Sequence, residues 1–94
     1  MATYILLGTL TNEGAEKLRQ HPEWIDEVRD DMEKNGVRVI AQYAVLGPYD
    51  IVNIVEAPDN RSVVRLSAQL TLHSSLKITT LPALSMEDFL STLK

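Results

Sequence analysis

Apolar residues recur along this chain with two different periods, and the switches between those periods predict strands alternating with helices. Strands are expected at residues 3–10, 37–46, 49–57 and 76–84, where β-branched and other apolar side chains dominate. In the first of these segments both alternating sets carry large apolar side chains, as in a central strand that is covered on both faces. Pro82 lies within the fourth segment, and a proline there favours the edge of a sheet.

Helices are expected at residues 11–35, 60–72 and 85–94. The first of them has apolar residues at steps of three and four, namely Ala15, Leu18, Pro22, Ile25, Val28 and Met32. Pro22 disfavours helix at His21, so we expect a break there and a second helical piece over residues 23–34. In the last helix Ser85 is a candidate cap, and four side chains are expected to face inward: Met86, Phe89, Leu90 and Leu93.

The predicted order is β-α-β-β-α-β followed by a short C-terminal helix, within a single domain over residues 1–94. This is the order of the ferredoxin-like sandwich, an α+β fold. Its four-stranded antiparallel sheet carries both main helices on one face, which leaves the other face without cover.

The hairpin around Gly47 and Pro48 indicates which residues share a face of the sheet. With Leu46 opposite Tyr49, Gln42 falls opposite Asn53. We expect Val39, Ala41, Tyr43, Val45, Val52 and Ile54 to face the helices. The opposite face would then hold Ile40, Leu46, Ile51 and Val55, together with either Ile78 or Leu81.

So many apolar residues on an uncovered face predict an interface. We therefore expect a homo-oligomer, at least a dimer, in which two sheets pair as a dimeric α/β barrel. The Gln42–Asn53 pair would lie inside that barrel or at its rim, where buried amides need hydrogen-bond partners.

Composition narrows the choice of partners and cofactors. The chain has 94 residues and no Cys, which excludes disulfides, thiolate metal sites and Cys nucleophiles. With only His21 and His73 as imidazoles, we expect no metal and no cofactor. The net charge is −4 and the nine basic residues are scattered, so neither nucleic acid nor an anionic membrane is an expected partner. There is no apolar stretch of the roughly 20 residues that span a bilayer, and we expect a cytoplasmic protein.

Six residues are candidates for ligand binding, while no catalytic residue can be assigned. Asp50 is either a proton acceptor at the mouth of a pocket, with Tyr49 or Tyr43 as donor, or an acceptor of backbone N–H groups in its turn or at a helix cap. His73 ends the second main helix, where a cation interacts well with the helix dipole, and a ligand role is the alternative. The full set is Tyr43, Tyr49, Asp50, Gln42, Asn53 and His73.

Several separated motifs resemble those of one known family. Gly47-Pro48-Tyr49-Asp50 leads into IVNIVEAPD at residues 51–59. Further motifs are YILL at residues 4–7 followed by Thr9, Thr11 and Gly14, then Asn35-Gly36, and TTLPA at residues 79–83. Together they resemble the GYD-domain family, named for its Gly-Tyr-Asp motif. The resemblance implies a ferredoxin-like fold of the type that forms dimeric α/β barrels, and it implies little about activity.

Three functions are compatible with these observations. The leading hypothesis is a small oligomeric domain of the GYD type with a sheet-face interface and a small-molecule cavity. The alternatives are a cofactor-free enzyme, isomerase or monooxygenase-like, and a ligand-sensing module, either one acting on a small apolar or aromatic molecule. An enclosed cavity lined by Tyr43, Gln42, Asp50 or Asn53 favours the alternatives, whereas a filled, dry interface favours a structural role.

Overall fold

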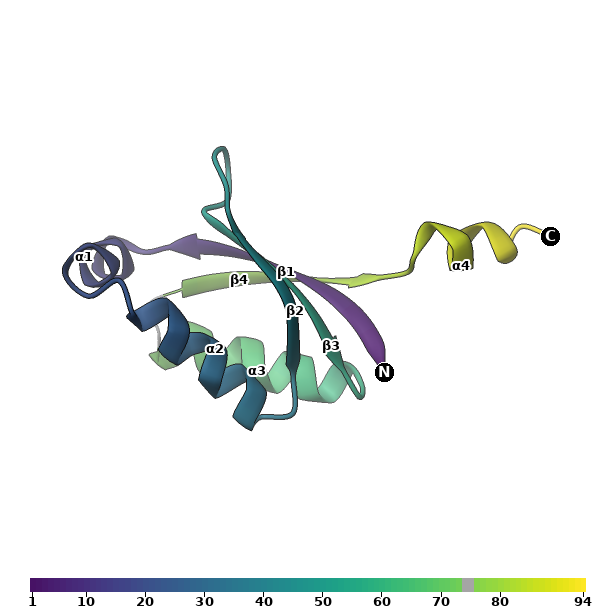
Figure 1. Cartoon of the computed structure of the whole chain (residues 1–94), viewed down its shortest axis with the longest axis horizontal. Helices are drawn as coiled ribbons and strands as arrows, with labels where there is room; N and C mark the ends of the chain where they lie inside the picture. Colours follow the sequence, from purple (N-terminus) through teal and green to yellow (C-terminus); the bar gives the residue numbers. More distant parts are fainter. Residues whose placement is uncertain (74–75) are drawn as a thin grey trace.

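The computed structural model describes residues 1–73 and 76–94, with the side chain of His73 outside the described part. Its elements follow the predicted order, with a four-stranded sheet, two helices beneath it and a small helix at the C-terminal end (Figure 1). The α+β, ferredoxin-like prediction is confirmed. The elements are β1 (Ala2–Leu10), α1 (Asn12–Gln20), α2 (Trp24–Lys34), β2 (Arg38–Ala44), β3 (Ile51–Ala57), α3 (Asn60–His73), β4 (Leu76–Ala83) and α4 (Met86–Ser91).

Local chemistry sets the ends of the helices. The hydroxyl of Thr11 accepts the backbone N–H of Gly14 at 3.0 Å and caps α1. The predicted break around Pro22 is confirmed, because α1 ends at Gln20 and α2 begins at Trp24. The carboxylate of Asp59 accepts the backbone N–H of Ser62 at 2.9 Å, and this bond holds the pKa of Asp59 below its ordinary value.

The strands form one antiparallel sheet in the order β2-β3-β1-β4. The central strand β1 pairs with β3 on one side and with β4 on the other. β4 is therefore an edge strand, which agrees with the interpretation of Pro82. β2 forms the opposite edge.

Helices α2 and α3 pack on the same face of the sheet (Figure 1), with α2 against β2 and α3 against β3 and β4. The core between them and the sheet is apolar, and Trp24 is part of it with 3% of its surface exposed. The other buried members are Tyr4, Leu6, Val28, Met32, Val37, Val39, Val55, Ala57, Val63, Leu66, Leu70 and Leu76.

The structure corrects the predicted assignment of sheet faces. Gln42 does pair with Asn53, but these two residues lie on the helix side together with Ile51 and Val55. Val39 lies on the helix side, as predicted, opposite Val55, because a β-bulge at Ile40 separates its direction from that of Ala41. Consequently the uncovered face is the one that carries Ala41, Tyr43, Val52 and Ile54, with Leu81 rather than Ile78 from β4.

The prediction that the C-terminal helix faces inward is wrong. Ser85 caps α4 as expected, since its hydroxyl accepts the backbone N–H of Asp88 at 3.0 Å. The helix nevertheless extends away from the sheet (Figure 1), and all four side chains expected inside are exposed: Met86, Phe89, Leu90 and Leu93.

Candidate functional site

The uncovered side of the sheet is the first candidate site, and we call it the open face. Its apolar side chains come from all four strands, alternate with residues of the core, and are turned away from α2 and α3. Tyr43 and Leu81 are 58% and 43% exposed, and the side chains from the two central strands are half-buried. The apolar members are Ile5, Leu7, Ala41, Tyr43, Val52, Ile54 and Leu81.

Polar residues border this apolar centre at both ends of the strands. At one end Arg38 of β2 faces Glu56 of β3, with Arg38 Nη1 3.6 Å from Glu56 Oε1. At the other end Lys77 of β4 lies opposite Thr9 of β1. An apolar centre with a polar rim is the usual composition of a protein–protein interface. Along a strand whose outer face normally contacts water, core-facing apolar residues would instead alternate with solvent-facing polar residues.

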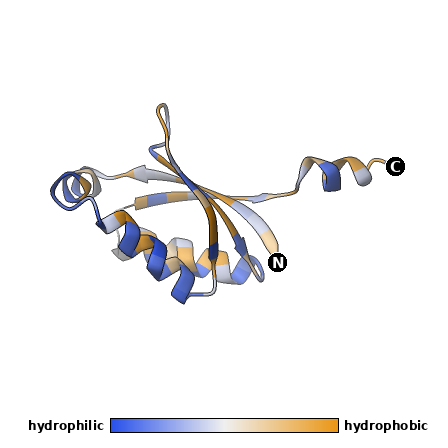
Figure 2. Cartoon of the chain, in the orientation of Figure 1, coloured by the Kyte–Doolittle hydropathy of each residue, from blue (hydrophilic) through white to orange (hydrophobic). Residues whose placement is uncertain are grey.

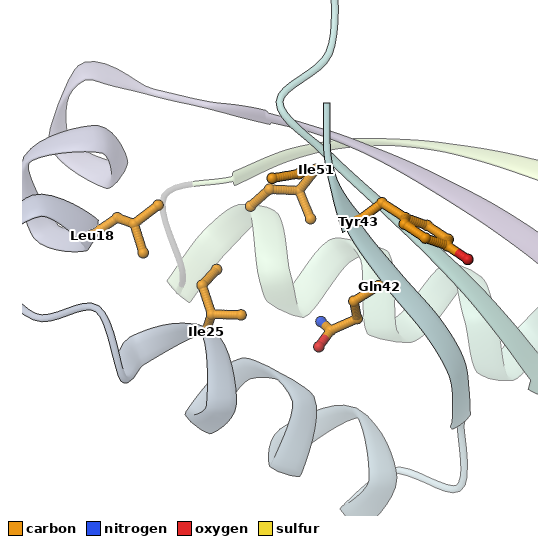
Figure 3. A pocket seen from close by; sticks show the side chains of 6 residues that line it. Leu18, Ile25, Gln42, Tyr43 and Ile51 are labelled. Atoms are coloured by element: carbon orange, nitrogen blue, oxygen red, sulfur yellow. The ribbon is translucent and has the colours of Figure 1, made fainter. Parts of the chain in front are cut away.

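A second candidate site is a pocket of about 260 Å³ beside β2, between the sheet and the α1–α2 region, and we call it the edge pocket. Leu18 of α1, Ile25 of α2 and Ile51 of β3 turn toward one another across it, and the Gln42 amide points toward α2 (Figure 3). The ring of Tyr43 turns away from the other side chains, in keeping with its place on the open face. Tyr43 and Ala44 complete the lining, so among the described residues Gln42 supplies the only side-chain amide in an otherwise largely apolar wall.

Asn53 lies next to this pocket wall, directly opposite Gln42 in the sheet. It is 4% exposed, and its Oδ1 has no hydrogen-bond partner among the described residues. A buried acceptor left unpaired costs about 1–3 kcal/mol. Such an atom is therefore a natural acceptor for a donor that enters from outside the chain.

Asp50 makes hydrogen bonds through its carboxylate and its backbone at the base of the β2–β3 hairpin. Its Oδ2 accepts the backbone N–H of Leu10 at 2.9 Å, its own N–H donates to the Gly8 carbonyl, and its carbonyl accepts the N–H of Val45. The carboxylate thus joins the hairpin to the end of β1, rather than closing its own turn or capping a helix. Gly47 has a φ of 118°, in the left-handed region that favours glycine.

Two of the six residues predicted to bind a ligand, Gln42 and Tyr43, line the edge pocket, but the six do not all converge on it. Gln42 and Asn53 lie on the helix side, Tyr43 extends from the open face, and Tyr49 and Asp50 lie at the hairpin base, both half-buried. His73 ends α3, as expected, but its side chain lies outside the described residues. Sequence reasoning placed Leu18 and Ile25 on a core stripe and missed that they line a pocket.

Two further properties of the described residues bear on function. No three carboxylate or imidazole side chains in residues 1–73 and 76–94 are grouped closely enough to hold a metal ion. In the same part of the chain, every helix is too short or too polar to cross a bilayer.

Substitutions of Asp50 test whether its carboxylate stabilises the fold or serves a catalytic role. Asp50→Ala removes the acceptor for Leu10 N–H, and we expect it to lower the free energy of unfolding by about 1.5–3 kcal/mol, the usual contribution of a hydrogen bond to a charged group. Asp50→Asn keeps an acceptor oxygen and should lose clearly less. Urea unfolding followed by circular dichroism measures both, and equal, negligible losses would contradict a structural role.

Comparison with known proteins supports one family. Residues 4–93 match the family model of the GYD domain, which is nearly the whole chain. A curated protein of Thermus thermophilus is 50% identical over 95 residues, with all of this chain and all of that protein covered. That relative is named glutamine synthetase and cystathionine beta-lyase binding protein.

Proposed function

Because this chain belongs to the GYD-domain family, we propose that it is a small protein-binding domain that works as a self-associated unit, with two copies meeting through their open faces. The two copies would enclose the open faces between them, as in a dimeric α/β barrel. The helices α2 and α3 would remain on the outside of the pair.

The open face is the observation that carries this proposal. Transfer of one large apolar side chain from water into a packed interface is favourable by about 1.5–3 kcal/mol, and less for the half-buried ones. Six such residues are gathered here on one face, namely Ile5, Leu7, Tyr43, Val52, Ile54 and Leu81. A second copy presents the same surface, so an isologous pair buries both at once.

A protein partner is supported by the relative from Thermus thermophilus. The two chains are 50% identical over their full lengths, and that relative is named for binding two enzymes. We propose that this chain likewise binds an enzyme, with glutamine synthetase as the first candidate. The surfaces outside the paired sheets, including α2 and α3, would be available for that contact.

Self-association is tested by adding charge to the open face. Ile54→Lys and Leu81→Lys should shift the mass measured by light scattering at micromolar concentration from at least twice 10.5 kDa to 10.5 kDa. Val64→Lys adds the same charge on α3, where Val64 is 64% exposed, and should leave the mass unchanged. Circular dichroism verifies that each variant is folded. An unaltered chain with the mass of one copy would refute the proposal.

Binding to an enzyme is tested with purified glutamine synthetase from the same source as this chain. We expect a saturable complex by biolayer interferometry, with a Kd in the micromolar range or tighter, as for a specific interface. An unrelated enzyme of similar size and charge is the control. If the signal with glutamine synthetase equals that control, an enzyme partner of this kind is excluded.

The edge pocket favours a second candidate function, the binding of a small apolar molecule that carries one N–H or O–H donor. The pocket has apolar walls and the Gln42 amide, and one strand away lies the Oδ1 of Asn53, which has no hydrogen-bond partner in the described part of the chain. Ligand pockets typically combine an apolar lining with a few polar groups that orient the ligand.

Indole is a suitable probe of that pocket, because it is aromatic and carries a single N–H donor. Saturation-transfer NMR should detect its binding to the unaltered chain. Ala44→Phe, at an exposed position in the pocket wall, should abolish the signal by filling the space, whereas Val64→Phe on α3 should not. Equal signals from these two variants would exclude the pocket as the binding site.

A further inference from the structure

The last eleven residues form a projection that we call the C-terminal arm, residues 84–94. It begins where strand pairing stops, because Ala83 with Thr3 is the last pair between β4 and β1. Met86, Phe89, Leu90 and Leu93 follow the spacing i, i+3, i+4, i+7 and form one apolar stripe. They are 68%, 47%, 50% and 68% exposed, and orange and blue alternate along the arm in Figure 2.

Such an arm needs a surface to pack against. α4 has six residues, whereas isolated helices shorter than about 12–15 residues are marginal in water. The arm also extends the molecule: the radius of gyration is 14.0 Å, against roughly 12 Å for a compact chain of this length. The long axis measures 51 Å, and the arm lies at one end of it (Figure 1). An apolar stripe held this far from its own core is placed to contact another molecule.

The open face alone is small for a stable dimer. Four strands of about seven residues cover a planar area of about 440 Å², from about 3.3 Å per residue and about 4.8 Å between strands. Stable interfaces bury about 800 Å² of accessible surface on each partner, a quantity that exceeds the planar footprint of the same patch because side chains roughen it. The arm offers additional apolar surface, so a pair that engages both the sheet and the arm comes closer to the size required.

The loop of the β2–β3 hairpin, residues 45–50, is the other projection of the chain, and its tip carries Leu46 with 100% of its surface exposed. It joins β2 and β3 at the end of the sheet where Gly8 pairs with Ile51. The arm leaves β4 at the end where Thr3 pairs with Ala83. Since β2 and β4 are opposite edges, the tip and the arm occupy diagonally opposite corners.

Consider two sheets that face each other and are related by a two-fold axis, which lies midway between them and runs perpendicular to that diagonal. This axis places the hairpin corner of one copy over the arm corner of the other. The strands of the two sheets then cross at a large angle, which is a known mode of sheet packing. The same operation brings the arm of each copy over the hairpin tip of the other. Both contacts are identical by symmetry, as an isologous interface requires.

We infer that the C-terminal arm of one copy packs on the hairpin tip of a second copy, its apolar stripe against Leu46 and the neighbouring Tyr43. This contact rests on the proposed pairing through the open face, and it makes the pair reciprocal, with two arms and two tips engaged. The arm is thereby assigned to self-association and not to the enzyme partner.

Disulfide trapping in the whole 94-residue chain tests this contact. No other thiol can form a competing disulfide, because the chain has no Cys of its own. In Leu46→Cys/Leu90→Cys, oxidation should convert most of the protein to a covalent dimer on a non-reducing gel. Closure within one chain is excluded, because a disulfide requires Cα atoms within about 7 Å and the two sites lie at opposite corners of the sheet. The single variants and Val64→Cys/Leu90→Cys, with its first thiol on α3, should stay largely monomeric on the gel.

The outcomes separate this contact from the pairing on which it rests. If light scattering shows a dimer but the Leu46→Cys/Leu90→Cys variant is trapped no faster than Val64→Cys/Leu90→Cys, pairing stands and the arm contact is refuted. If the chain has the mass of one copy, both are refuted. As a second readout, Phe89→Ser/Leu90→Ser should weaken dimerisation at least tenfold by analytical ultracentrifugation. An unchanged dimer in that variant would also overturn the arm contact.

Discussion

The architecture depends on one imbalance: a single sheet has two apolar faces, and the chain supplies helices for only one of them. On the covered face α2 and α3 bury a core that includes Leu6, Met32, Val55 and Leu66. On the other face Ile5, Leu7, Val52 and Ile54 are only half-buried. The proposed pairing of two open faces would bury this remaining apolar surface.

Sequence reasoning recovered the elements of this fold because their signals are local. Thr11 and Ser85 cap helices, Pro22 breaks one, and Gly47 allows a left-handed turn, each through chemistry within a few residues. The pairing of Gln42 with Asn53 followed from the hairpin in the same way. Such features depend on nearest neighbours along the chain and are readable without knowledge of the packing.

The faces of the sheet were assigned wrongly, for two physical reasons. Both faces of the hairpin are apolar, so alternation alone does not show which one meets the helices. The helix side also contains two amides, Gln42 and Asn53, and Asn53 is buried with an oxygen that no group of residues 1–73 or 76–94 pairs. The bulge at Ile40 then shifts Val39 relative to Ala41, which no count of alternating residues anticipates. Likewise, the bond from Leu10 to Asp50 spans 40 positions and is invisible to local patterns.

The bulge at Ile40 has a consequence for how the molecule avoids forming fibres. An edge strand with a regular row of free N–H and C=O groups allows strands from other chains to pair alongside it and extend the sheet. Here β2 is interrupted at Ile40, and β4 carries Pro82, which lacks a donor, together with the charge of Lys77. Both borders of the sheet therefore resist lateral extension. The proposed face-to-face pairing would in this way give a closed assembly of fixed size rather than a continuous fibre.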